Sequence, residues 1–242
     1  MPYFPGGIMK KFLLCTLIAL TASLCVFAGD VAVFTDIGFS DDGQTYIFGQ
    51  YGKKDKTYQA WADIFTVNVA KNEYVKNEVF STTPSKETAN LTGKTAFDLL
   101  AKKAEWKTAK YNCKPASGAT LLYVRSDETK KPTDEIVFKD FESSTEEKEV
   151  YYHIKLVPTY TGSGKKVSSK YYINLEKQDG DGNVLFQKKV GTPDFQRKGI
   201  SSYKITRIFS DKSGKSIVFI IEKTLEDETG TSIRYMVETV RF

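Results

Sequence analysis

Val31-Ala-Val-Phe-Thr-Asp-Ile-Gly-Phe39 and Thr45-Tyr-Ile-Phe-Gly-Gln-Tyr51 stand on either side of the short polar segment Ser40-Asp-Asp-Gly43. Both outer runs are rich in β-branched and aromatic residues, which favour strands. The Asp-Gly pair between them is a strong hairpin signal, because the turn needs a positive φ that glycine adopts without strain. The stretch therefore predicts an antiparallel hairpin in a chain built mainly from strands.

The same pattern continues outward from this hairpin and returns at the end of the chain. It predicts five further strands, at residues 62–69, 74–80, 203–210, 216–221 and 232–240. When the two ends of the chain are aligned on Gly43 and Gly214, Phe48 and Phe219 fall at the same offset. We interpret this as two related meanders, that is, an internal repeat.

The middle of the chain also reads as strands joined by polar loops. The candidate strands are residues 121–124, 135–138, 149–157, 170–175 and 184–188. Apolar residues in the third of these alternate with Tyr151, His153 and Lys155, as expected for a strand with one face in water. The segment Asp179-Gly-Asp-Gly-Asn183 begins like a calcium loop, but valines stand where an EF-hand needs glycine and glutamate. A hairpin turn is the better interpretation of that segment.

One α-helix is expected near residues 95–110. Thr95 and Asp98 have the spacing of a capping box, with Thr95 as the N-cap. Phe97, Leu100 and Ala104 then share one face. The predicted fold class is mainly β, with antiparallel meanders arranged as propeller-like blades and this one helix inserted; a β-sandwich is the alternative.

The first 28 residues have the features of a secretory signal peptide. Lys10 and Lys11 precede an apolar run, and a cleavage site fits between Ala28 and Gly29. The Met-Lys-Lys sequence that opens at Met9 indicates the natural start. An uncleaved N-terminal anchor and lipid attachment at Cys25 are the alternatives. We therefore expect residues 29–242 to form a single exported domain, periplasmic or extracellular.

Composition excludes several classes of protein. The chain has 242 residues, of which 40% are hydrophobic and 13% aromatic, so it can bury a substantial core. Its net charge of +5 falls to +3 when the leader is removed with Lys10 and Lys11. This excess is too small for a nucleic-acid binder. No segment after the leader is long and apolar enough to predict a membrane span.

Few residues suit catalysis or metal binding. His153 is the only histidine, and Cys113 is the only cysteine outside the leader. Zinc sites and nucleophile–base pairs need more of these side chains than the mature chain offers. The carboxylates are numerous but scattered, and paired-carboxylate hydrolysis requires a spacing that sequence does not reveal. We predict no cofactor and no metal, and we do not expect an enzyme.

Aromatic residues provide the candidate binding positions. They are Trp61, Tyr151, Tyr160 and Tyr171, together with His153 on the wet face of its strand. Packing in a strand-rich core is the alternative role for these rings. We predict a non-catalytic binding module of the cell envelope for protein or glycan. A secreted hydrolase using carboxylates and a lipid-anchored structural component are the alternatives.

Two resemblances follow from these motifs. Phe39-Ser-Asp-Asp-Gly43 and Asp63-Ile-Phe-Thr-Val67 resemble the propeller repeats of periplasmic TolB-like proteins. Asp36-Ile-Gly-Phe-Ser-Asp-Asp-Gly43, Phe48-Gly-Gln-Tyr-Gly52 and Tyr203-Lys-Ile-Thr-Arg207 resemble a bacterial family of predicted secreted proteins, domain of unknown function 2259. This second resemblance covers both ends of the mature chain. It implies export and a β-rich domain, and it supplies no catalytic residue, substrate or cofactor.

Overall fold

A computed structural model describes residues 30–118, 120–126, 129–227 and 230–242. The predicted signal peptide, its cleavage between Ala28 and Gly29, and the alternative of a lipid on Cys25 all lie outside the described residues. Within the described part of the chain, no helix is long and apolar enough to cross a membrane.

The strands form three antiparallel sheets. The helix-side sheet has the order β1(Val33–Phe39), β2(Thr45–Lys53), β3(Ala60–Asn68) and β4(Glu73–Ser81). The middle sheet has the order β13(Gly230–Arg241), β12(Ser216–Asp227), β11(Ile200–Ser210) and β5(Leu121–Val124). The outer sheet has the order β10(Arg197–Lys198), β8(Ser168–Asp179), β7(Val150–Thr161) and β6(Ile136–Lys139), with β9(Val184–Val190) also paired to β8. The mainly-β, antiparallel fold class is therefore confirmed.

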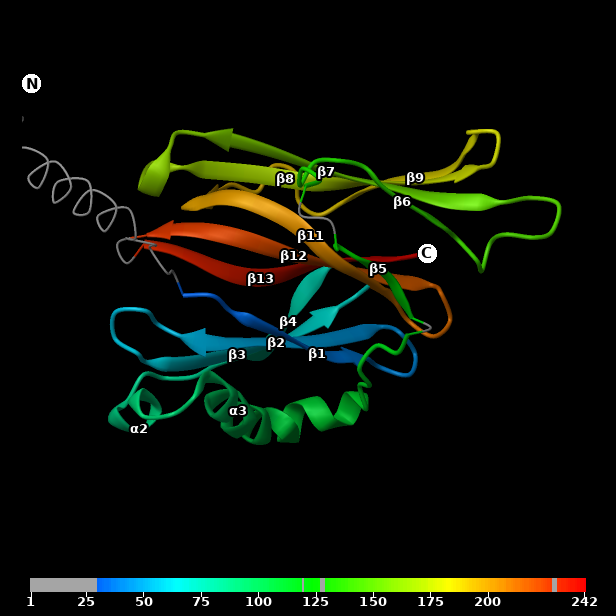
Figure 1. The fold of residues 1–242 in the computed structure, drawn as a ribbon. Coiled ribbons are helices and arrows are strands. Elements are labelled where there is room, and N and C mark those ends of the chain that lie inside the picture. The colour runs from blue at the N-terminus through cyan, green and yellow to red at the C-terminus, as the bar shows by residue number, and fades with distance from the viewer. Residues whose placement is uncertain (1–29, 119, 127–128, 228–229) are drawn as a thin grey trace, which may run out of the picture.

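These sheets stack face to face, and helices cover one end of the stack (Figure 1). One apolar cluster fills the space between the outer and middle sheets, and a second lies between the middle and helix-side sheets. A third cluster joins the helix-side sheet to α3(Gly93–Thr108). The molecule is thus a layered structure in which each interface has its own core.

Both faces of the middle sheet are buried at its centre, as β12 shows most clearly. Ile217, Phe219 and Ile221 pack toward the outer sheet, whereas Val218 and Ile220 pack toward the helix-side sheet. All five side chains are fully buried. Successive side chains of a strand point to opposite faces, so an unbroken apolar run is what a strand buried on both faces requires.

The predicted propeller arrangement is wrong. Propeller blades are set radially around a central channel, whereas the sheets described here are stacked as in a sandwich. The two meanders do share their turn chemistry. Gly43 and Gly214 both have positive φ, of 66° and 68°, and each donates its N–H to the carbonyl three residues earlier. Ser216 also donates from its hydroxyl to the Gly43 carbonyl, so the two turns contact each other.

The helix lies where the sequence predicts it, but it begins earlier. Its N-cap is Thr92 rather than Thr95, because the Thr92 hydroxyl accepts the Thr95 N–H. Ala96, Phe97, Leu100 and Ala104 form its buried face. A short 3₁₀ turn, η1(Ala109–Tyr111), extends it to Asn112 in the left-handed conformation, and a separate helix, α2(Lys86–Ala89), precedes it.

Candidate functional site: a cationic groove

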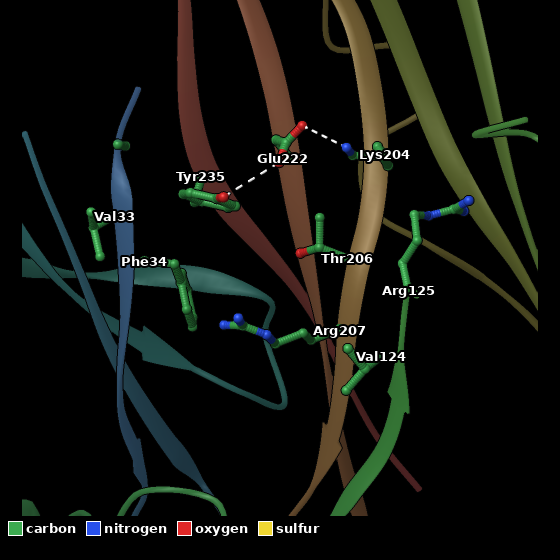
Figure 2. Close-up of a pocket in the computed structure, with 10 residues that line it drawn as sticks. Val33, Phe34, Val124, Arg125, Lys204, Thr206, Arg207, Glu222 and Tyr235 are labelled. Atoms are coloured by element: carbon green, nitrogen blue, oxygen red, sulfur yellow. Dashed lines mark hydrogen bonds and ion pairs between the residues drawn. The ribbon is translucent and has the colours of Figure 1, made fainter. Parts of the chain in front are cut away.

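A groove of about 370 Å³ opens where the helix-side sheet ends and the middle sheet continues. Figure 2 shows β1 along one side and β5 along the other, with the face of the middle sheet as the floor. The residues that line the groove are Ala32, Val33, Phe34, Val124, Arg125, Lys204, Thr206, Arg207, Glu222 and Tyr235. The four strands of the middle sheet and β1 of the helix-side sheet therefore supply the side chains drawn there.

The groove lies beside a contact between the helix-side and middle sheets. Phe34 on β1 packs edge-on against Tyr235 on β13, with ring centroids 5.5 Å apart. Along β12, the side chains on the face toward the helix-side sheet change from Val218 and Ile220 to Glu222, as expected where a sheet face meets water.

Glu222 is the one carboxylate among the described residues that line the groove, and both of its oxygens have partners. Glu222 lies 3.0 Å from the Lys204 ammonium and accepts a hydrogen bond of 3.3 Å from the Tyr235 hydroxyl. Burial, followed by the charge of Glu222, raises the pKa of Tyr235 to about 12, so its hydroxyl stays protonated and donates. Lys204 and Tyr235 therefore hold the Glu222 carboxylate in place.

Arg207 points its guanidinium into the groove toward Phe34 (Figure 2), 5.9 Å from the centroid of that ring. No carboxylate among the described residues lies within ion-pair distance of it, and its side chain is exposed. Arg125 donates to two backbone carbonyls, those of Ile205 and Lys130. Among the described residues, three cations and one carboxylate thus line the groove beside aromatic rings, which is an environment for an anion.

Two of the aromatic residues predicted from sequence lie in the interior. The Trp61 indole donates to the Asp30 carboxylate at 2.9 Å, and the Arg234 guanidinium stacks 4.0 Å from the Trp61 ring centroid. The Tyr171 hydroxyl donates to Glu238 at 2.5 Å. Both rings are more than nine-tenths buried and fully partnered. They do not face the groove, and a binding role for them stays a prediction.

The other three predicted positions lie on the outer sheet, away from the groove. His153 is half-buried on the outward face of β7, with its Nδ1 3.5 Å from a Glu135 carboxylate oxygen. Tyr151 on the same face donates to Glu149 at 2.7 Å. Tyr160, near the end of β7, is 40% exposed and stacks on Tyr203. The structure therefore places Tyr151 and His153 on one surface and leaves their binding role untested.

Cys113 lies between the end of the helix and the β1 edge and is partly buried. Burial, and then the charges of Asp36, Asp42 and Asp41, raises the pKa of its thiol to about 12. A thiol with that pKa holds very little thiolate near neutral pH, and the thiolate is the nucleophile. No group of three or more His, Cys, Asp or Glu side chains in the described ranges is arranged to hold a metal.

We expect Cys113 to alkylate far more slowly in the folded protein than in urea. A pKa of about 12 instead of 9 reduces the thiolate fraction at pH 8 by roughly three orders of magnitude. Iodoacetamide labelling at pH 8, followed by mass spectrometry of the peptide that contains Cys113, measures this directly. A native rate within tenfold of the rate in urea would contradict the described environment of the thiol.

Sequence reasoning missed Arg125 and Arg207, and for Arg207 the reason is a bulge. Regular alternation along β11 would send Lys204 and Thr206 to one face and Arg207 to the other. The register of β11 with β12 shifts between Ile205 and Arg207, which turns Arg207 toward the groove. The sequence does carry a signal for the floor of the groove. The apolar run of residues 217–221 ends at Glu222, which indicates where that strand face becomes polar.

Comparison with known proteins gives one match. A family model described as "Predicted secreted protein (DUF2259)" matches residues 47–241. This confirms the second of the two sequence resemblances, and nothing supports the similarity to TolB-like propeller repeats. Neither the search of curated proteins nor the search of solved structures returns a match.

Proposed function

Because the chain belongs to this family of predicted secreted proteins, we propose that it is an exported, non-catalytic binding protein of the cell envelope whose groove holds an anionic ligand. The observation that carries the proposal is Arg207, an exposed guanidinium that points into a groove and has no carboxylate within ion-pair distance among the described residues. Its charge reaches Asp36 of β1, where it lowers the pKa against the larger, opposite effect of burial. Arginine is suited to this role because its planar fork binds carboxylates in a bidentate manner.

The composition of the groove favours binding over hydrolysis. Hydrolysis by carboxylates requires two such groups on either side of the scissile bond. Glu222 is the one carboxylate among the described residues that line the groove, and it contacts Lys204 and Tyr235. The cations and rings, by contrast, offer what an acidic protein segment or an acidic glycan needs: charge-assisted hydrogen bonds and a flat apolar surface.

Charge reversal in the groove is expected to weaken binding of polyanions. The probes are poly-L-glutamate and polygalacturonate, and titration calorimetry of the purified protein measures the dissociation constant. A charge-assisted hydrogen bond contributes about 1.5–3 kcal/mol, so Arg207→Glu is expected to weaken binding at least tenfold. Arg125→Glu is expected to act in the same direction.

Lys155→Glu is the matched control, because Lys155 is an exposed strand cation on the outer sheet, away from the groove. It changes net charge by the same amount and is expected to leave affinity within about twofold at 0.15 M salt, where distant charges are screened. Circular dichroism of each variant checks the fold. If neither polymer binds, or if all three variants weaken binding equally, the groove is not the site.

A further inference from the structure

The edge of β1 determines what kind of ligand the groove fits. β1 is the edge strand of the helix-side sheet and pairs with β2 alone. On its other side, the Lys114 N–H donates to the Phe39 carbonyl at 3.0 Å, and the two residues form an antiparallel bridge. The Ala116 N–H then donates to the Asp36 carboxylate at 2.7 Å. Residues 114–116 therefore begin a fifth strand position beside β1.

The chain occupies only the first part of this fifth strand position. After residue 116 the backbone turns at Ser117, whose carbonyl accepts the N–H groups of Thr120 and Leu121, and continues as β5 in the middle sheet. Among the described residues, no strand pairs with residues 33–36 on their open side. Four strand residues span about 13 Å, and the groove lies along this length.

Residues 33–36 of the edge include no lysine and no proline, and the bulge in β1 comes at their end, between Asp36 and Gly38. Proteins commonly guard edge strands with lysine, proline, bulges or a covering loop. Here residues 33–36 read Val-Phe-Thr-Asp, and the Val33 side chain is 48% exposed. Across the groove, Val124 on β5 is 46% exposed. An extended backbone laid between them would gain hydrogen bonds from β1 and apolar contact from both valines.

The charges beside the edge select among extended chains. A strand added to β1 would point every second side chain at the floor, where the exposed Arg207 guanidinium lies; Arg125 lies across the groove, with its guanidinium directed away from Arg207. Carboxylates at those alternate positions would complement Arg207, whereas lysines would be repelled. An acidic glycan would pair with the same charges, but it has no peptide backbone to form strand hydrogen bonds with the edge of β1.

We propose that the groove binds an extended, acidic segment of a partner polypeptide, which adds to β1 as the fifth strand of the helix-side sheet. This inference rests on the proposed function and specifies its ligand. Main-chain hydrogen bonds to residues 33–36 give affinity, and acidic residues at positions i and i+2 give specificity.

The test separates strand addition from simple attraction of charges. The probe is the peptide acetyl-Glu-Thr-Glu-Val-Glu-Thr-amide, compared with two forms that are N-methylated at alternate amides. In a two-stranded pair only alternate amides point at the neighbouring strand. We therefore expect one methylated form to lose at least tenfold in affinity and the other to bind as the parent does. The Gln-for-Glu peptide is expected to bind at least tenfold more weakly than the parent.

Hydrogen exchange of the protein supplies the second readout. Amides on the open side of residues 33–36 are expected to exchange at least tenfold more slowly when the parent peptide is bound. Equal binding of both methylated forms would overturn strand addition. Binding of polygalacturonate but not of the peptide would overturn the polypeptide ligand and leave the proposed function standing, whereas binding of neither would overturn both. Protection of residues 33–36 in the free protein that is lost on dilution would instead identify a second copy of this chain as the occupant.

Discussion

Replacing either of two neighbouring residues in β12, Phe219 or Ile220, by alanine is expected to lower the free energy of unfolding by about 3 kcal/mol or more. Both side chains are fully buried, but in different cores. Phe219 belongs to the cluster between the middle and outer sheets, and Ile220 belongs to the cluster between the middle and helix-side sheets. Each truncation therefore leaves a cavity in a different interface.

A neighbouring pair in the outer sheet provides the control. Ile154 is fully buried, whereas Lys155, the next residue of β7, is exposed on the outward face. Ile154→Ala is expected to cost about 2–5 kcal/mol and Lys155→Ala less than about 0.5 kcal/mol. Urea unfolding of the four variants measures this contrast. If Phe219→Ala or Ile220→Ala costs less than about 1 kcal/mol, the middle sheet is not covered on both faces.

Gly38→Ala is expected to be the most disruptive single-methyl change near the groove. Gly38 has a φ of 107°, and a Cβ added there would lie 1.7 Å from the Lys114 carbonyl oxygen. The backbone strain costs on the order of 1–3 kcal/mol. The contact cannot be relieved by a rotamer change, because its partner is backbone. Residues 114–116 must therefore move off the β1 edge, and the Lys114–Phe39 bridge is lost.

Gly180→Ala is the matched change, because a Cβ at Gly180 meets no atom within 4 Å. Urea unfolding is expected to show a loss of about 2 kcal/mol or more for Gly38→Ala and little change for Gly180→Ala. Hydrogen exchange of Lys114 is expected to accelerate in the Gly38 variant alone. Equal unfolding midpoints for the two variants would contradict the close packing of residues 114–116 on β1.

Local features of the fold could be predicted from the sequence, and the stacking of the sheets could not. The Asp-Gly turn at Gly43 and the strand at residues 121–124 were predicted correctly, because turn chemistry and β-rich runs are local signals. The helix start was placed at Thr95 rather than Thr92, because two threonines three residues apart are both competent N-caps and only the structure shows which hydroxyl accepts.

The propeller prediction failed because sheet packing depends on which faces are buried, and similar hairpin turns occur in either arrangement. The apolar run of residues 217–221 was a signal of a strand covered on both faces. The groove could not be predicted from the sequence. Its cations come from β11 and from Arg125 after β5, segments about 80 residues apart in the chain. In addition, a bulge reverses the expected direction of the Arg207 side chain. The partners of the buried Trp61 and Tyr171 rings, Arg234 and Glu238, are likewise far from them in the sequence.

Chemical-shift mapping tests most directly whether the groove is the binding site. Backbone amide spectra of the purified protein would be recorded while the acidic peptide is added, and again with polygalacturonate. The proposed function predicts the largest changes at residues 33–36, Arg125 and Arg207, with small changes at Tyr151 and His153 on the outer sheet. Largest changes at Tyr151 and His153, with residues 33–36 unmoved, would contradict it.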